Sequence, residues 1–152
     1  MSLYKTINIS SIANVQEDRS LILTINLANS ILEQWCLCLC LLYHGLTDTV
    51  QVTDNQTLLN IQLGKNVKTS MRGLVFRQRN GYLITITKQE LEYWLSFFLK
   101  YWRDGVAEVD HIDVELIPDK TVSTDEFDLI LRVDKFAPPV SPTELYRRLS
   151  KL

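Results

Sequence analysis

Residues 73 to 105 read GLVFRQRNGYLITITKQELEYWLSFFLKYWRDG and contain the local signals that decide the fold class. Asn80-Gly81 lies between two alternating apolar runs, a strong short-range signal for a β-hairpin with strands at 73–78 and 82–87. Directly afterwards, apolar residues recur every three or four positions, which predicts a helix from about Lys88 to Arg103. The core face expected for this helix comprises Leu91, Trp94, Leu95, Phe98, Leu99 and Trp102.

Capping boxes mark the expected starts of three helices. In each, Ser or Thr is followed three residues later by Glu, so that two unpaired backbone amides are satisfied reciprocally. The three boxes begin at Ser30, Thr87 and Ser141. The helix that begins after Thr87 is expected to end before Gly105, because glycine tolerates the left-handed conformation that closes many helices.

The start of the first helix has two interpretations. It begins at Ser30 if residues 21 to 27 form a strand, in which alternate apolar side chains share one face. It begins near Arg19 if a continuous apolar stripe from Leu21 to Leu42 is helical. The stripe favours the long helix, although the β-branched residues near its start disfavour it. In both interpretations the helix ends at His44-Gly45.

Further apolar runs predict strands at 49–52, 58–63, 109–117 and 127–133, and no internal repeat is apparent in the sequence. Strands that follow one another as hairpins form antiparallel sheets. The predicted fold is therefore α+β: an antiparallel sheet of about five to six strands, with two long helices packed on one face and a short C-terminal helix.

Length and composition predict one domain. The chain has 152 residues, a net charge of −2 and 46% hydrophobic residues, which is typical of a globular protein. We expect a single domain over 1–136, followed by a linker at Pro138-Pro139 and a terminal helix within 137–152. The longest apolar run, Trp35 to Tyr43, is too short to span a membrane, and no targeting signal is recognised. Three clustered cysteines without a disulfide pattern favour a cytoplasmic protein.

The clustered cysteines have two interpretations, a metal site or core packing. Cys36, Cys38 and Cys40 lie close to His44, but the intervening leucines and the lack of a turn do not suit four ligands that converge on one ion. Cysteines in an apolar helix are more often small core residues. The sequence therefore predicts no metal site and no cofactor.

The best candidate for acid–base chemistry is a set of alternating residues on one strand. His111, Asp113 and Glu115 project from the same face, while the residues between them are apolar. A strand with one solvated face has the same pattern. An enzyme or metal-dependent hydrolase that uses these three residues is the second functional hypothesis.

Charge is segregated along the chain. The segment from 65 to 88 is basic, and the residues after it are mainly acidic. Arg77 and Arg79 are expected to reach solvent on the strand face opposite Leu74 and Phe76, where they could contact a phosphate backbone. Nucleic-acid binding ranks third, because no aromatic side chain lies between the basic residues on that face. The candidate basic surface comprises Lys65, Lys68, Arg72, Arg77 and Arg79.

The 88–103 helix is apolar around most of its circumference. Tyr93, Phe97 and Tyr101 form a second line beside the core face, and a helix of this kind needs two partners. The second partner is either the first helix or a second subunit. The leading hypothesis is a small cytoplasmic, non-catalytic interaction protein, adaptor or chaperone-like, that forms a homodimer through this line and binds another protein.

The predicted element order also carries a resemblance. A helix, several antiparallel strands, a long helix, two strands and a terminal helix resemble the small acidic dimeric chaperones of type III secretion in order, without a shared motif. The resemblance implies a dimeric protein-binding role, but a fold alone does not establish a function.

Overall fold

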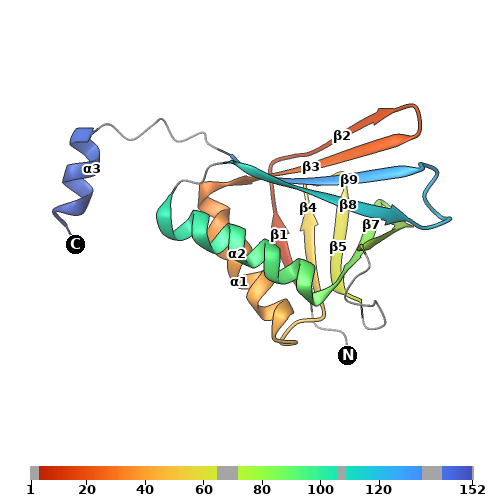
Figure 1. Cartoon of the computed structure of the whole chain (residues 1–152), viewed down its shortest axis with the longest axis horizontal. Coiled ribbons are helices and arrows are strands. Elements are labelled where there is room, and N and C mark those ends of the chain that lie inside the picture. The colour runs from red at the N-terminus through yellow and green to blue at the C-terminus, as the bar shows by residue number, and fades with distance from the viewer. Residues whose placement is uncertain (1–3, 65–71, 106–108, 135–141, 152) are drawn as a thin grey trace.

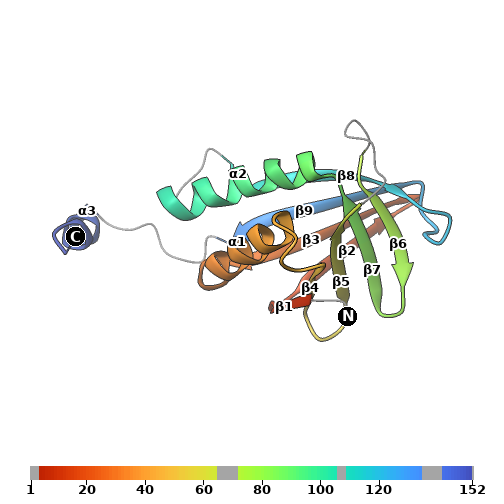
Figure 2. The same ribbon diagram turned by 90° about the horizontal axis from the view of Figure 1, so that it is seen from below.

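The computed structural model describes residues 4–64, 72–105, 109–134 and 142–151. Its body is α+β: a curved nine-stranded sheet carries the helices α1 (Asn29–Tyr43) and α2 (Lys88–Asp104) on one face (Figures 1 and 2). Neither these helices nor any other in the described residues is long and apolar enough to cross a membrane.

Three strands precede α1, where the sequence favoured a long helix. They are β1 (Tyr4–Asn8), β2 (Ile12–Glu17) and β3 (Ser20–Ala28). The long helix is wrong, because alternate residues of β3 are buried between two strand neighbours, antiparallel β2 and parallel β9. The β-branched residues of this segment suit such a pleated surface. The order of elements therefore differs from the secretion-chaperone order, which begins with a helix.

The remaining strands lie close to their predicted positions. The first pair is β4 (Thr49–Thr53) and β5 (Leu58–Leu63), and the Asn80-Gly81 hairpin joins β6 (Leu74–Gln78) to β7 (Gly81–Ile86). The last pair is β8 (His111–Pro118) and β9 (Glu126–Asp134). Asn80 has a φ of 69°, the left-handed conformation that the hairpin turn requires.

The sheet is larger than predicted and mixed rather than antiparallel. Its order is β1-β4-β5-β7-β6-β8-β9-β3-β2. The three predicted hairpins, β4 with β5, β6 with β7 and β8 with β9, are antiparallel as the local signals indicated. The hairpin of β2 and β3, which was not predicted, is antiparallel as well. Four further pairings are parallel, namely β1 with β4, β5 with β7, β6 with β8, and β9 with β3. These pairings join segments that are distant in sequence, and local patterns carry no information about them.

The strand pairings repeat, although the sequence shows no obvious repeat. The first half, β1 to β5 with α1, contains a hairpin, a helix and a second hairpin, and the second half, β6 to β9 with α2, has the same order. Each half places its second hairpin beside the other half, as β5 with β7 and β9 with β3. In the first half the initial strand is divided: β1 pairs with β4, whereas β2 pairs with β3.

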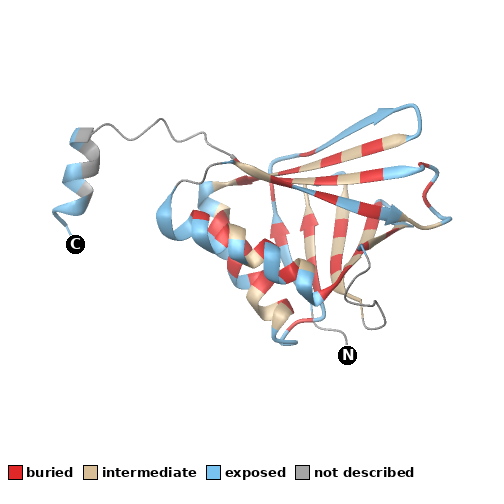
Figure 3. Cartoon of the chain, in the orientation of Figure 1, coloured by how far each residue is buried: buried red, intermediate tan, exposed pale blue. Residues whose placement is uncertain are grey.

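The inner face of the sheet and the two helices enclose the core (Figure 3). Trp35 of α1 meets Phe98 of α2 edge to face, with ring centroids 5.7 Å apart. Thr87 caps α2 as predicted, because its side chain accepts a hydrogen bond from the Glu90 amide at 3.0 Å. The predicted cap at Ser30 is wrong: α1 begins after Ala28 without a side-chain cap, and Ser30 lies inside the helix.

The core face of α2 is rotated relative to the prediction. Leu91, Trp94 and Phe98 are fully buried as expected. Leu99 and Trp102, which were also assigned to the core, are 39% and 52% exposed. Tyr101 is buried in place of Trp102. The helix therefore presents an apolar edge to solvent near its C-terminal end.

The C-terminal segment stands apart from the body in Figure 1. It contains α3 (Pro142–Leu149), whose Tyr146 and Leu149 are exposed. The predicted linker, Pro138-Pro139, and the predicted cap, Ser141, lie outside the described residues. The two-layer fold consequently consists of the sheet with α1 and α2.

Candidate functional site

The aromatic line predicted on α2 is divided between the core and the surface. Tyr93 is 56% exposed, whereas Tyr101 is only 4% exposed. Phe97 lies between them in burial and packs on the ring of Phe98, with centroids 5.0 Å apart. Burial raises the pKa of the Tyr101 hydroxyl, and the nearby Asp110 carboxylate raises it further. Of the three aromatic residues, Tyr93 offers most of its surface to a partner.

Contacts from α1 hold the N-terminal half of α2. The Tyr43 hydroxyl donates to Glu92 Oε1 at 2.6 Å, and this hydrogen bond raises the pKa of Tyr43. The ammonium group of Lys88 lies 4.6 Å from the centre of the Tyr43 ring, a cation–π contact. These contacts fix one side of α2 and leave the edge formed by Leu99 and Trp102 open.

A shallow hollow follows this open edge of α2. It is lined by Ser96, Leu99, Lys100, Trp102 and Arg103. Two large apolar side chains and two basic ones therefore share one exposed surface. The sequence placed Leu99 and Trp102 in the core, because helical periodicity identifies a face but does not show how far the layer beneath it extends.

The alternating triplet of β8 lies on the outer face of the sheet, away from the helices. Asp113 and Glu115 are exposed and His111 is half-buried. His111 Nδ1 lies 2.8 Å from Asp110 Oδ1, and this hydrogen bond holds the pKa of Asp110 below its usual range. Glu115 pairs with Arg72 at 3.2 Å. In the described part of the chain, no group of three or more His, Cys, Asp or Glu residues could hold a metal ion.

Asp128 of β9 completes an acidic surface that the sequence did not identify. It lies directly opposite Glu115 in the β8–β9 register. Burial raises the pKa of Asp128, and the carboxylates of Glu115, Glu126 and Asp113 raise it further. The sequence shows alternating acidic residues in both predicted strands. It does not show the register that places Asp128 opposite Glu115, because a long loop connects the two strands.

The cysteines occupy α1 as core residues. Cys36 and Cys38 are each 4% exposed, and Cys40 is partly exposed. Burial, together with the neighbouring Cys40, raises the pKa of the Cys36 thiol to about 11, so this thiol is protonated at neutral pH. His44 is exposed at the C-terminal end of the helix and its ring lies 5.2 Å from that of Tyr43.

The candidate basic surface is not one continuous face among the described residues. Lys65 and Lys68 lie outside them. The strand faces of β6 are reversed relative to the prediction: Val75 is fully buried, whereas Leu74 and Phe76 are half-buried on the outer face. Arg77 therefore projects on the core side beyond Val75, where its guanidinium lies 5.4 Å from the centre of the Tyr82 ring. Arg79 is in the hairpin turn.

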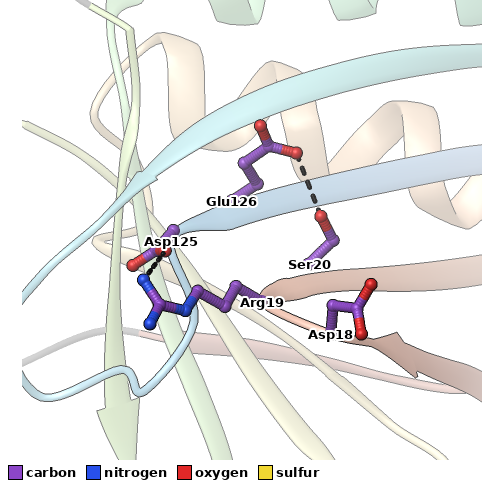
Figure 4. Close-up of a pocket in the computed structure, with 5 residues that line it drawn as sticks. All are labelled: Asp18, Arg19, Ser20, Asp125 and Glu126. Carbon is purple, nitrogen blue, oxygen red and sulfur yellow. Dashed lines mark hydrogen bonds and ion pairs between the residues drawn. The ribbon is translucent and has the colours of Figure 1, made fainter.

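A second acidic surface lies at the turn between β2 and β3 (Figure 4). Arg19 pairs with Asp125 at 3.3 Å, and the Ser20 hydroxyl donates to Glu126 at 3.0 Å. Asp18 has a φ of 51° and points away from the other four residues. The sequence could not place these residues together, because the parallel pairing of β3 with β9 joins residues that are 106 positions apart in the chain.

In comparisons with known proteins, no protein-family model matches the chain, and no curated protein or solved structure is significantly similar to it.

Proposed function

We propose that this protein is a small, non-catalytic protein-interaction protein that acts as a homodimer, with α2 at the contact between the two copies. The observation that carries the proposal is the exposure of Leu99 and Trp102 on α2, directly beside the helix face that Leu91, Trp94 and Phe98 bury in the core. Tryptophan and other large aromatic residues are enriched at the centres of protein interfaces. An isologous contact would bury this edge against itself, the commonest arrangement in soluble oligomers.

Of the predicted line of Tyr93, Phe97 and Tyr101, only Tyr93 is largely exposed, and it lies on the opposite side of α2 from Trp102, nine residues away along the helix. Phe97 and Tyr101 support α2 from within, with ring centroids 6.3 Å apart. A charge at Phe97 would therefore disturb the core, and it would not test the interface alone. Trp102 is the better probe, because a charged residue there meets solvent in the isolated protomer.

Light scattering across a concentration series tests the dimer. The natural protein is expected to be a dimer, and Trp102→Lys a folded monomer that still unfolds in one cooperative thermal transition, independent of protein concentration. Leu37→Lys is the matched control, because Leu37 is 58% exposed on the other helix. A natural protein that stays monomeric at all concentrations would refute the homodimer. A dimer that persists in Trp102→Lys would place the contact elsewhere.

A further inference from the structure

One edge of β2 has backbone groups without partners. β2 ends the sheet and pairs only with β3. The Ile12 amide donates to Asp54 Oδ2 at 2.7 Å, so it faces away from β3. Because the backbone groups of an antiparallel strand alternate in direction, the amides and carbonyls of Asn14 and Gln16 face the same way. In the described part of the chain, no backbone group pairs with them.

The corresponding edge in the second half is filled by the protein itself. β6, the counterpart of β1 and β2, pairs with β8 at Leu74 and Val75. Farther along, the Arg77 amide donates to the hydroxyl of Thr121 at 2.9 Å, in the loop after β8. In the first half, the Asp54 carboxylate accepts the hydrogen bond from the Ile12 amide, and among the described residues no strand pairs with this edge of β2 from there to Glu17.

β2 also lacks the features that protect exposed strand edges. Proteins usually blunt such an edge with proline, lysine or a bulge, or cover it with another segment. The strand reads IANVQE, contains neither proline nor lysine, and is exposed at every residue after Ile12. Its pairing with β3 is uninterrupted from Ile12 to Glu17, so no bulge bends the edge away. An extended segment could therefore pair with this edge as an additional strand.

We propose that the free edge of β2 binds an extended, basic segment of a partner protein as an added strand. This rests on the proposed function, since it locates the binding of another protein. Glu17 and Asp18 lie at the end of this edge. Asp125 and Glu126 lie on the other side of β3, next to Arg19 and Ser20 (Figure 4). Arg19 is the one cation beside these four carboxylates, and it is paired with Asp125. The complementary segment carries lysine or arginine.

Packing on the outer face specifies the centre of the segment. Val15 is 49% exposed and lies opposite Ile22 of β3, which is half-buried. An apolar residue of the added strand would cover Val15. A second copy of this protein suits the edge less well, because its own β2 contains no lysine or arginine that could pair with Glu17. We therefore expect the bound segment to have an apolar residue that packs on Val15, with a basic residue two positions before and after it.

A labelled peptide with the sequence Thr-Lys-Thr-Val-Thr-Lys-Thr tests the site by fluorescence anisotropy. Its alternation places valine and both lysines on one face, and its symmetry permits either strand direction. We expect binding that weakens as salt is raised, and loss of binding when glutamate replaces both lysines. Glu17→Lys is expected to weaken binding of the lysine peptide as well.

Two substitutions at one position separate the backbone from the side chain. Asn14→Pro removes the outward amide and leaves the bonds to β3 intact, since proline is tolerated on the solvent side of an edge strand. It is expected to weaken peptide binding about tenfold, because a backbone bond is lost and the ring obstructs the neighbouring strand. Asn14→Ala keeps the amide and is expected to change binding less than about twofold.

Modified peptides test the same bond without altering the protein. One peptide carries N-methyl groups on lysine and valine, and another carries them on the threonines. Because only alternate amides of the bound peptide face β2, one peptide should lose binding and the other should retain it. Equal binding of the two, or no binding by the natural protein, would overturn the proposal.

The outcomes separate this site from the dimer contact on α2. If the natural protein is monomeric but binds the peptide, the dimer fails and the β2 site stands. If Asn14→Pro abolishes self-association instead of peptide binding, a second copy occupies the edge and the peptide proposal fails. Trp102→Lys is expected to leave peptide affinity unchanged, which makes it the control for a folded chain.

Discussion

Asn60 on β5 and Asp128 on β9 occupy equivalent places in the two halves of the sheet. Each lies two residues after the start of the parallel pairing that joins its strand to the other half, at Leu58–Gly81 and at Glu126–Ser20. Asn60 lies opposite Gln51, whereas Asp128 lies opposite Glu115. The outer face thus carries neutral amides in the first half and carboxylates in the second.

The inner faces of the two halves are alike where the outer faces differ. Leu23 of β3 and Ile84 of β7 are fully buried at equivalent places, and so are Ile61 of β5 and Leu129 of β9. Burial of alternate apolar residues keeps both halves in register, because a shift of one residue would move every side chain to the opposite face. The outer residues are free to differ, so the surface chemistry of each half can change without changing the fold.

The largest change in stability is expected where the parallel pairings between the halves begin, at Gly81 in one pairing and Ser20 in the other. Gly81 begins β7, and a Cβ there would overlap the backbone carbonyl of Leu58. Its counterpart Ser20 carries a side chain that donates to Glu126. Gly81→Ala should therefore lower the free energy of unfolding by roughly 3 kcal/mol or more, as severe overpacking does.

Chemical denaturation of Gly81→Ala and Ser20→Ala measures this difference. Ser20→Ala loses one exposed hydrogen bond and should cost no more than about 1 kcal/mol. Similar losses in the two variants would show that the junctions are equally tolerant, and that the close approach at Gly81 relaxes without cost.

Elements defined by local chemistry could be predicted from the sequence. The Asn80-Gly81 turn, the Thr87 cap and the Gly105 end placed β6, β7 and α2 within about a residue of their observed bounds. β1 and β2 were missed because both strands are almost entirely exposed, with Ile7 and Ile12 as their buried residues. A strand with so few buried residues has no alternating apolar pattern that would distinguish it from a loop in the sequence.

The parts that depend on distant contacts could not be predicted. The alternation in β3 also fits a helical stripe, and only its pairing with β9 decides between them. The same limit applies to the candidate sites. Trp102 and Tyr101 are adjacent in sequence, and the extent of the layer beneath α2 determines which of them is buried. The free edge of β2 follows from the full strand order, which no local pattern contains.

The next prediction concerns the thiols that α1 carries and α2 lacks. Cys36→Ala together with Cys40→Ala should lower stability by roughly 1–2 kcal/mol, because small core truncations leave part of their volume unfilled. Peptide mapping after brief alkylation of the natural protein at pH 8 should find Cys40 modified before Cys36, since the raised pKa of Cys36 keeps that thiol protonated. Stoichiometric zinc that is lost in the double variant would contradict a packing role.

A smaller change in stability is expected from substitutions at the N-terminal ends of α1 and α2. Thr87 caps α2, whereas Ala28 precedes α1 without a side-chain acceptor. Thr87→Ala should cost about 1 kcal/mol, and Ala28→Ser should add about 0.5 kcal/mol, because the backbone of Ala28 already has the extended conformation of an N-cap. Thermal unfolding of the two variants measures both effects. A destabilised Ala28→Ser would mean that the environment of Ala28 excludes a hydroxyl.

The smallest effect is expected from converting the acidic face toward its neutral counterpart. Asp128→Asn places at β9 the residue that the first half has at Asn60. Like charges directly opposite each other in a sheet are destabilising, and Asp128 faces Glu115. The variant should therefore be more stable than the natural protein at pH 7, by about 0.5 kcal/mol.

The pH dependence of this gain identifies its cause. Because burial and the neighbouring carboxylates raise the pKa of Asp128 in the folded protein, its protonated form favours folding. That contribution is complete below the ordinary aspartate pKa of about 3.9 and is lost as the pH rises through the higher folded pKa. The advantage of Asp128→Asn should thus be present at pH 7 and vanish by about pH 3.5. Glu33→Gln, which removes one exposed charge from α1, is the control in the same denaturation series. If both variants gain equally, relief of overall charge explains the effect, and the carboxylates of β8 and β9 act independently of one another.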